Sequence, residues 1–257
     1  MVARSELEKS LSPQRLNLDR RQLRACPLIQ GDSRLRLVNY QNNRIARVSN
    51  LSNLPNLIFL DLYNNVIDTL DGPLASATSL RVLMVGKNRV QQVSNLERLS
   101  KLDVLDLHSN AIHAIQGMGS LQELRVLNLA GNLIRTVENV KCLQSLTELN
   151  LRRNNIEKVL ELDCLPCLQR LFLSNNRIRD FADCECLFCV GSLLELSLDG
   201  NPVAGQNGIG SAYRRHILER LQGLRHLDLK RVTEEELRGS PPLPTIAPAA
   251  AGGGSGG

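Results

Sequence analysis

The sequence lacks tryptophan and has few aromatic residues of any kind. Its 257 residues include 4 Phe and 3 Tyr, so aromatic residues make up 3% of the chain. The hydrophobic content is nevertheless 42%, which is enough to bury one sizeable continuous core. That core must consist mainly of aliphatic side chains, which is unusual for a β-sandwich or an α/β enzyme.

Long apolar segments and runs of one charge are also missing. The first residues, 1–9, carry charges where a secretory leader has an apolar block, and no later stretch approaches a membrane-spanning helix. The 31 basic and 26 acidic residues give a formal net charge of +5 that is spread along the chain, without the basic run of a nucleic-acid-binding arm. We therefore expect a soluble, cytoplasmic protein that binds neither nucleic acid nor membrane.

What the sequence does contain is an internal repeat of about 22 residues. The template Leu-x-x-Leu-x-Leu-x-x-Asn-x-Ile runs from Leu57 to Ile67 and returns from Leu102 to Ile112, from Leu124 to Ile134, and in further copies. The asparagines of the template recur at steps of 22 or 23 residues, with a last step of 25; they are Asn43, Asn65, Asn88, Asn110, Asn132, Asn154, Asn176 and Asn201. This pattern is the leucine-rich repeat.

The repeat predicts the fold class. Leucines that alternate with other residues favour a short strand whose leucines point inward, and successive copies pair as a parallel sheet. The asparagine at each turn can bond backbone groups of its own and adjacent turns, which would otherwise be buried without partners. We predict an α/β leucine-rich-repeat solenoid, right-handed and curved, with a parallel sheet on its concave face and short helical or 3₁₀ segments on its convex face.

The two ends depart from the repeat. Residues 1–34 hold an N-terminal segment and a degenerate cap repeat, residues 35–204 hold about eight leucine-rich repeats, and residues 205–238 form a C-terminal cap with a helix near Ser211 and a last partial repeat. In that helix Tyr213, Ile217 and Leu221 fall on one face, which we expect to seal the last leucine layer. Residues 239–257, rich in Pro, Ala and Gly, have the composition of a disordered linker or tail.

Seven cysteines, an odd number, show no pairing pattern and fit reduced thiols. Cys164 and Cys167 lie one repeat before Cys186 and Cys189, and such pairs can chelate zinc. Cys142 occupies the equivalent place one repeat earlier, which favours a position that accepts a small buried thiol. We expect no metal and no cofactor, and zinc is the alternative.

Catalysis requires convergent titratable groups, and the four histidines (His108, His113, His216 and His226) fall on different repeats and faces. Only His108 is predicted to lie on the concave side, and no nucleophile accompanies it in the pattern. We therefore expect a protein that is not an enzyme.

The register also predicts which side chains point out of the sheet. An apolar centre is expected from Phe59, Tyr63, Met84, Val104 and His108, with Phe172 farther along and a basic flank from Arg152, Arg153 and Arg170. Large side chains at the middle of such a face are common interface anchors. For Val82, Val104 and Val126, a β-branched stripe that merely suits strand pairing is an equal alternative.

Several segments beyond the repeat consensus carry a family likeness. They are residues 15–23, 102–108, 146–152, 165–174 and 227–236, and the likeness runs from about Arg15 to Leu237. In these segments the chain resembles the leucine-rich-repeat subunit of the tubulin polyglutamylase complex. The resemblance implies a monomeric, non-catalytic scaffold within a hetero-complex, with polyglutamylase subunits and tubulin as partners, located on microtubules, centrosomal material or cilia. The general repeat type also looks like the regulatory repeat protein of phosphatase 1, so a subunit that docks on that phosphatase is the alternative.

Overall fold

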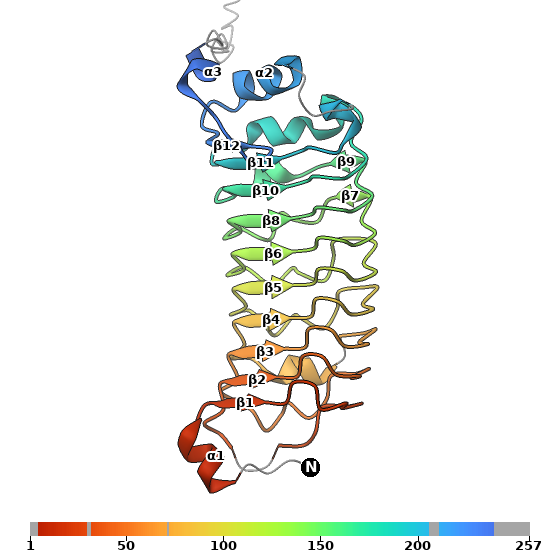
Figure 1. Ribbon diagram of the computed structural model, residues 1–257, viewed down its shortest axis with the longest axis vertical. Coiled ribbons are helices and arrows are strands. Elements are labelled where there is room, and N and C mark those ends of the chain that lie inside the picture. The colour runs from red at the N-terminus through yellow and green to blue at the C-terminus, as the bar shows by residue number, and fades with distance from the viewer. Residues whose placement is uncertain (1–4, 30–31, 71, 206–210, 239–257) are drawn as a thin grey trace, which may run out of the picture.

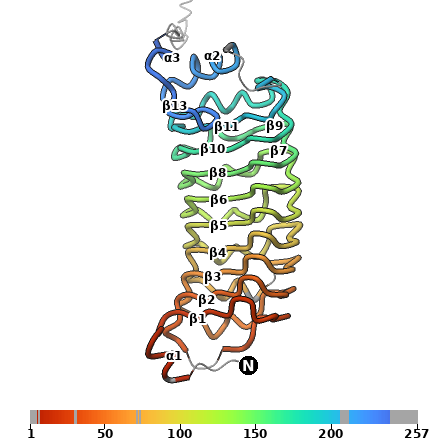
Figure 2. The backbone as a smooth tube through the Cα atoms, viewed as in Figure 1, coloured from red at the N-terminus to blue at the C-terminus, as the bar shows by residue number. Residues whose placement is uncertain are grey.

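The computed structural model describes residues 5–29, 32–70, 72–205 and 211–238. The chain winds as a stack of coils, each contributing one strand to a continuous sheet, and it rises from the N-terminal to the C-terminal end without turning back (Figures 1 and 2). The predicted tail, residues 239–257, lies outside the described residues. The architecture is that of a leucine-rich-repeat solenoid.

The strands are short and pair in sequence order. In the described part of the chain they form one sheet of eleven strands, parallel except at its last pair. Its members are β1 (Arg15–Asn17), β2 (Leu37–Asn39), β3 (Phe59–Asp61), β4 (Val82–Met84), β5 (Val104–Asp106), β6 (Val126–Asn128), β8 (Glu148–Asn150), β10 (Arg170–Phe172), β11 (Glu195–Ser197), β12 (His226–Leu227) and β13 (Lys230–Arg231).

The central residue of each three-residue strand of this sheet points into the coil and is buried, whereas the residues beside it point outward. Along the stack Leu60, Leu83, Leu105 and Leu127 are each 0% exposed, and the register aligns them from one strand to the next. Leucines therefore stack on leucines from β3 to β11, and Val38 takes this place on β2, which explains how a core forms without tryptophan. We call the outward side of the eleven-stranded sheet the concave face.

The repeated asparagines connect each coil to the one before it. The Nδ2 group of each donates to the carbonyl three residues earlier at 2.8–3.1 Å. The same group also donates to a carbonyl of the preceding coil at 2.8–3.0 Å. The Oδ1 atom accepts from a backbone N–H of the preceding coil at 2.9–3.1 Å. One side chain per coil thus satisfies polar groups that the coil itself leaves unpaired.

The residue before each of these asparagines has a positive φ. Asn42, Gly131 and Asn175 have φ of +56°, +67° and +58°. Glycine and asparagine tolerate this left-handed conformation better than other residues do. Lys87 and Arg153 occupy the same position with φ of +52° and +54°, so two long cationic side chains stand where small or amide residues are favoured.

The side opposite the sheet contains little regular structure. It carries the two-stranded pair β7 (Thr136–Val137) and β9 (Lys158–Val159). In the described residues it also has 3₁₀ segments at Gly72–Ser76, Leu162–Cys164 and Phe181–Cys189, and a further one, Pro202–Ala204, follows the last asparagine. Elsewhere single turns close the coil, as where Leu54 N donates to Leu51 O at 2.9 Å.

Helices cover both ends of the stack (Figure 1). Helix α1 (Glu6–Leu11) begins at a capping box between Ser5 and Glu8, and this helix was not predicted from the sequence. At the other end lies α2 (Ser211–Arg220), and the residues on its predicted inner face, Tyr213 and Ile217, are 7% and 0% exposed. A hairpin then joins β12 to β13, and α3 (Glu234–Arg238) follows.

Candidate interaction surface on the concave face

Three aromatic and small residues from successive coils form a platform in the middle of the concave face. The rings of Tyr63 and His108 lie 5.7 Å apart between centroids, tilted by 35°. Gly86 separates them, and a Cβ added at Gly86 would lie 2.4 Å from Cε1 of His108. The absence of a side chain at Gly86 therefore allows the imidazole to lie across the sheet toward Tyr63. We name Tyr63, Gly86 and His108 the aromatic platform.

Charged groups hold the platform in place. Asp106 accepts a hydrogen bond from the backbone N–H of His108 at 3.0 Å, and its Oδ1 lies 2.8 Å from Nδ1 of the imidazole. Lys87 Nζ lies 5.2 Å from the centroid of the Tyr63 ring, within cation–π range. The platform is a fixed arrangement of rings, and both rings remain partly exposed.

The other apolar residues of the predicted centre lie on the neighbouring strands. Phe59 on β3, Met84 on β4 and Val104 on β5 are all half-buried and point out of the sheet. Phe59 pairs in register with Val82, which in turn pairs with Val104. The structure thus brings the five predicted residues of the apolar centre together on three successive coils, three of them on the strands and Tyr63 and His108 just after them.

Phe172 does not lie exposed as the sequence analysis expected. It is 8% exposed, and the guanidinium carbon of Arg152 lies 4.1 Å from its ring centroid. Arg152 comes from the preceding coil and covers the ring, so Phe172 supports the arginine instead of offering its own surface.

The predicted basic flank divides into paired and unpaired arginines. Arg170 forms an ion pair with Glu148 of the adjacent strand and also lies beside Glu195 in register, so its charge is neutralised. Among the described residues Arg152 and Arg153 make no ion pair, and Arg153 is exposed.

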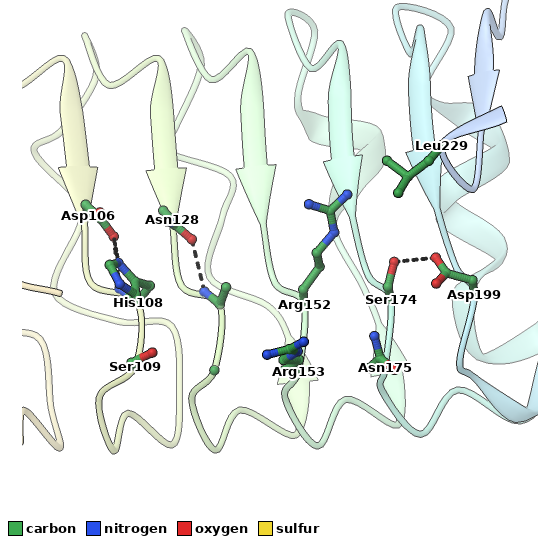
Figure 3. A pocket seen from close by; sticks show the side chains of 12 residues that line it. Asp106, His108, Ser109, Asn128, Arg152, Arg153, Ser174, Asn175, Asp199 and Leu229 are labelled. Carbon is green, nitrogen blue, oxygen red and sulfur yellow. Dashed lines mark hydrogen bonds and ion pairs between the residues drawn. The ribbon is translucent and has the colours of Figure 1, made fainter. Parts of the chain in front are cut away.

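A hollow of about 480 Å³ opens beside the aromatic platform, across the coils that carry β5 to β11 (Figure 3). We name it the basic hollow because Arg152 and Arg153 line it. Its other lining residues are Asp106, His108, Ser109, Asn128, Ala130, Gly131, Ser174, Asn175, Asp199 and Leu229. The small side chains of Ala130 and Gly131 leave the space open.

Both carboxylates of the basic hollow already accept hydrogen bonds from within the chain (Figure 3). Asp106 is bound by His108, and Asp199 accepts from the hydroxyl of Ser174 at 2.5 Å. On β3, burial of the Asp61 carboxyl is the main cause that raises its pKa, and the negative charges of Asp106 and Asp19 raise that pKa further. The two carboxylates that line the basic hollow, one on each side of the arginines along the stack, are therefore both engaged by neighbouring side chains.

In the described residues no histidine forms a hydrogen bond with a cysteine side chain. His108 has no hydrogen bond to a Ser, Thr or Cys side chain in the described residues, and it contacts only Asp106 through its ring nitrogens. His226 also lies on the sheet, on β12, which corrects the expectation that His108 is alone there. All seven cysteines are free thiols.

The described residues contain no group of three or more His, Cys, Asp or Glu side chains that could hold a metal ion. Cys167 and Cys189 are exposed, whereas Cys164 and Cys186 are partly buried. Cys186 Sγ lies 3.1 Å from the carbonyl of Val159, and burial raises its pKa. None of the helices in the described residues has the length and apolar character needed to cross a membrane.

A sequence profile of the leucine-rich repeat family matches residues 97–240. The chain belongs to this family. It is 50% identical over 72 residues to the human protein named Leucine-rich repeat-containing protein 49, a match that covers 28% of this chain and 10% of the human protein. The mouse protein of the same name is 50% identical over 59 residues, covering 23% of this chain and 9% of the mouse protein. The matches thus span about a tenth of these relatives.

Solved structures show the same fold. An internalin of Listeria monocytogenes superposes with a TM-score of 0.65 at 24% identity, covering 85% of this chain and 62% of the internalin chain. A leucine-rich-repeat protein of Leptospira interrogans gives a TM-score of 0.52 at 23% identity, covering 83% of this chain and 71% of that chain. These likenesses extend to the architecture alone.

Proposed function

We propose that this chain is a non-catalytic scaffold that holds a partner protein on its concave face. The observation that carries the proposal is the aromatic platform, where Tyr63 and His108 meet over Gly86 at the centre of a regular sheet. Partly exposed rings fixed by a carboxylate and a lysine resemble the rigid anchors that dominate binding energy at protein interfaces. The fold repeats one surface position per coil, so its outward rows form an extended surface suited to a polypeptide.

We further propose that the partners are subunits of a tubulin polyglutamylase complex, with tubulin itself as a further contact of the assembly. The identity to Leucine-rich repeat-containing protein 49 supports this assignment. The corresponding location is the cytoplasm, on microtubules, centrosomal material or cilia. A scaffold of this kind contributes positioning to a complex, and its partners contribute the chemistry.

Affinity purification of the tagged chain, followed by mass spectrometry, tests both statements. We expect polyglutamylase subunits or tubulin to be recovered with the wild-type chain. The F59A/Y63A variant should lose them, since it removes two large half-buried side chains from the concave face. Recovery of a phosphatase catalytic subunit in their place would contradict the polyglutamylase assignment and support the docking alternative.

A second variant tests the concave face without removing any side chain. In Gly86→Ala the added Cβ collides with the far end of the His108 side chain, not with backbone, so the imidazole must move while the coil remains. We expect binding to weaken by about tenfold, on the order of the 1–2 kcal/mol that a modest interface contact contributes.

The matched control is L133A/L160A, which removes two exposed apolar side chains that are 40% and 43% exposed and lie outside the strands of the sheet. This control should retain every partner. If it loses partners as F59A/Y63A does, or if both concave variants bind normally while folded, the concave-face proposal is wrong.

A further inference from the structure

We propose that the basic hollow binds an extended, carboxylate-rich segment of a partner protein, with Arg152 and Arg153 as its ion-pairing residues. This inference rests on the proposed function, because it assumes that the concave face receives a polypeptide. It adds the chemical class of the segment and the residues that select it.

The first observation is an asymmetry in how the charges of the hollow are satisfied. Its two carboxylates, Asp106 and Asp199, accept hydrogen bonds from His108 and Ser174. Within the described residues neither guanidinium forms an ion pair or a side-chain hydrogen bond. The charged groups left without a polar partner in the hollow are therefore cations, and the complementary ligand is an anion.

The second observation is the way in which the two arginines are held. The Phe172 ring supports the guanidinium of Arg152 at 4.1 Å, which restricts the rotamers of a long side chain. Arg153 stands at a backbone position with φ of +54° that Gly131 and Asn175 fill in the neighbouring coils. The coil imposes this conformation at the same place in each repeat, so Arg153 extends from a fixed point of the turn beside the hollow.

The third observation is the shape of the hollow. Ala130 and Gly131 form part of its lining between His108 on one side and the arginines on the other, and the volume of about 480 Å³ is open to solvent. Figure 3 shows Leu229 pointing from the β12–β13 hairpin toward the arginine side of the hollow. Leu229 is 71% exposed and has a φ of +63°, so an apolar contact is available beside the cations.

The charges of the hollow also favour carboxylates over phosphate. A guanidinium binds a carboxylate or a phosphate through two parallel N–H donors, so the neighbouring acids decide between them. Asp106 and Asp199 line the same space and repel a doubly charged phosphate more strongly than a singly charged carboxylate. An acidic segment with an apolar residue next to its carboxylates fits this combination.

Fluorescence anisotropy with a labelled octaglutamate peptide tests the inference on the full chain. We expect wild-type chain to bind the peptide and R152Q/R153Q to bind it about tenfold more weakly, the combined effect of two partly exposed ion pairs. R152K/R153K keeps both charges but loses the planar donors, and its affinity should fall between the two. Replacing Arg152 also uncovers the Phe172 ring, so R153Q alone is the second variant. R153Q should weaken binding by roughly threefold while its melting temperature stays unchanged.

The matched control is R135Q/R177Q, which removes the same two charges from exposed positions outside the strands of the sheet. It should change the affinity by less than about twofold. Equal weakening by this control, unchanged binding by R152Q/R153Q, or no binding of octaglutamate to wild-type chain would each overturn the proposal. Stronger competition by inorganic phosphate than by glutarate at equal ionic strength would overturn the carboxylate assignment.

Together, the affinity purification and the peptide measurement distinguish a failure of this inference from a failure of the proposed function. If F59A/Y63A loses partners while R152Q/R153Q still binds octaglutamate as the wild type does, the concave scaffold stands and the acidic-segment inference fails. If octaglutamate binding depends on the two arginines but no concave variant affects partner capture, the proposed function fails.

Discussion

Replacing one ladder asparagine with alanine tests the physical origin of the stack. Asn132 is 4% exposed and lies in a central coil. Its Oδ1 accepts from the N–H of Ile112 at 3.0 Å, and its Nδ2 donates to the carbonyls of Leu107 at 3.0 Å and Leu129 at 2.9 Å. Asn132→Ala removes all three bonds from the interior between two coils.

The three backbone groups bound by Asn132 differ in the hydrogen bonds that they keep. The carbonyl of Leu107 retains a bond from Asn110 Nδ2, and the carbonyl of Leu129 retains one from Asn154 Nδ2. The N–H of Ile112 is left without a partner, at a cost of about 1–3 kcal/mol, and each weakened carbonyl adds about 0.5–1.5 kcal/mol. We expect the free energy of unfolding to fall by roughly 2–6 kcal/mol, at the high end of single substitutions.

Urea unfolding followed by far-ultraviolet circular dichroism measures this change through the midpoint and the slope of the transition. Asn53→Ala is the control, since Asn53 is exposed, and it should stay within about 0.5 kcal/mol of the wild type. A loss below about 1 kcal/mol for Asn132→Ala would refute the claim that the ladder satisfies otherwise unpaired backbone groups.

Asn132→Asp sharpens the test, because it keeps the shape and loses the donors. The new carboxylate would be buried and would face two carbonyl oxygens. Both effects disfavour its charged form and raise the pKa of the new aspartate above the unfolded value of about 3.9. A raised pKa means that stability is highest below the unfolded value and is lost as the pH rises through the folded value. The deficit of Asn132→Asp relative to Asn132→Ala should therefore be largest at neutral pH and shrink toward pH 4.

Two further predictions concern thiols and the C-terminal cap. Maleimide labelling with peptide mapping at pH 8 should modify the exposed Cys167 and Cys189 first and leave Cys26 and Cys184 unmodified until denaturant is added. Burial protects Cys26 and Cys184 and raises the pKa of both thiols, that of Cys184 to about 12. Early labelling of Cys184 would contradict its burial. Pairing with Arg214 lowers the pKa of Glu236 from 4.5 to about 2, so its contribution to stability is complete above pH 4.5 and is lost as the pH falls toward 2. Thermal melts of E236Q between pH 2 and pH 6 should show a smaller loss on acidification than those of the wild type, and parallel curves would show that the pair does not stabilise the cap.

Much of the fold can be predicted from the sequence because one repeat length, shared by the leucines and the asparagines, determines it. The spacing of leucines fixes which side chains point inward, and the spacing of asparagines fixes where each coil turns, so both are visible without coordinates. The ends are harder, because their structure depends on single local features. Helix α1 begins at Ser5 and Glu8, three residues apart, and this short capping signal lies outside the repeat.

The antiparallel hairpin at the C-terminal end was also not predicted. It needs positive φ at Asp228 and Leu229, with φ of +52° and +63°. Aspartate is favoured in such a turn but leucine is not, so the Asp-Leu pair does not predict a hairpin. Contacts with the preceding coil, such as the bonds from Leu198 N and Asp199 N to Asp228 Oδ1 at 2.8 and 3.0 Å, hold this conformation.

The candidate site was predicted in position but not in detail. Strand register identifies the outward rows, so the locations of Phe59, Tyr63 and His108 follow from the repeat. The burial of Phe172 depends on Arg152 reaching one coil onward, a rotamer choice that no spacing encodes. The platform depends on Gly86, and a glycine in the outward row of a strand-containing coil is the signal that points to close approach there.

Photo-crosslinking from defined positions tests the central claim most directly. A photoreactive phenylalanine analogue replaces Tyr63 on the concave face in one variant and Glu138, exposed beyond β7 on the opposite side, in another. The account predicts that the Tyr63 position crosslinks a polyglutamylase subunit or tubulin and that the Glu138 position does not. Crosslinks to those partners from Glu138 alone would contradict it.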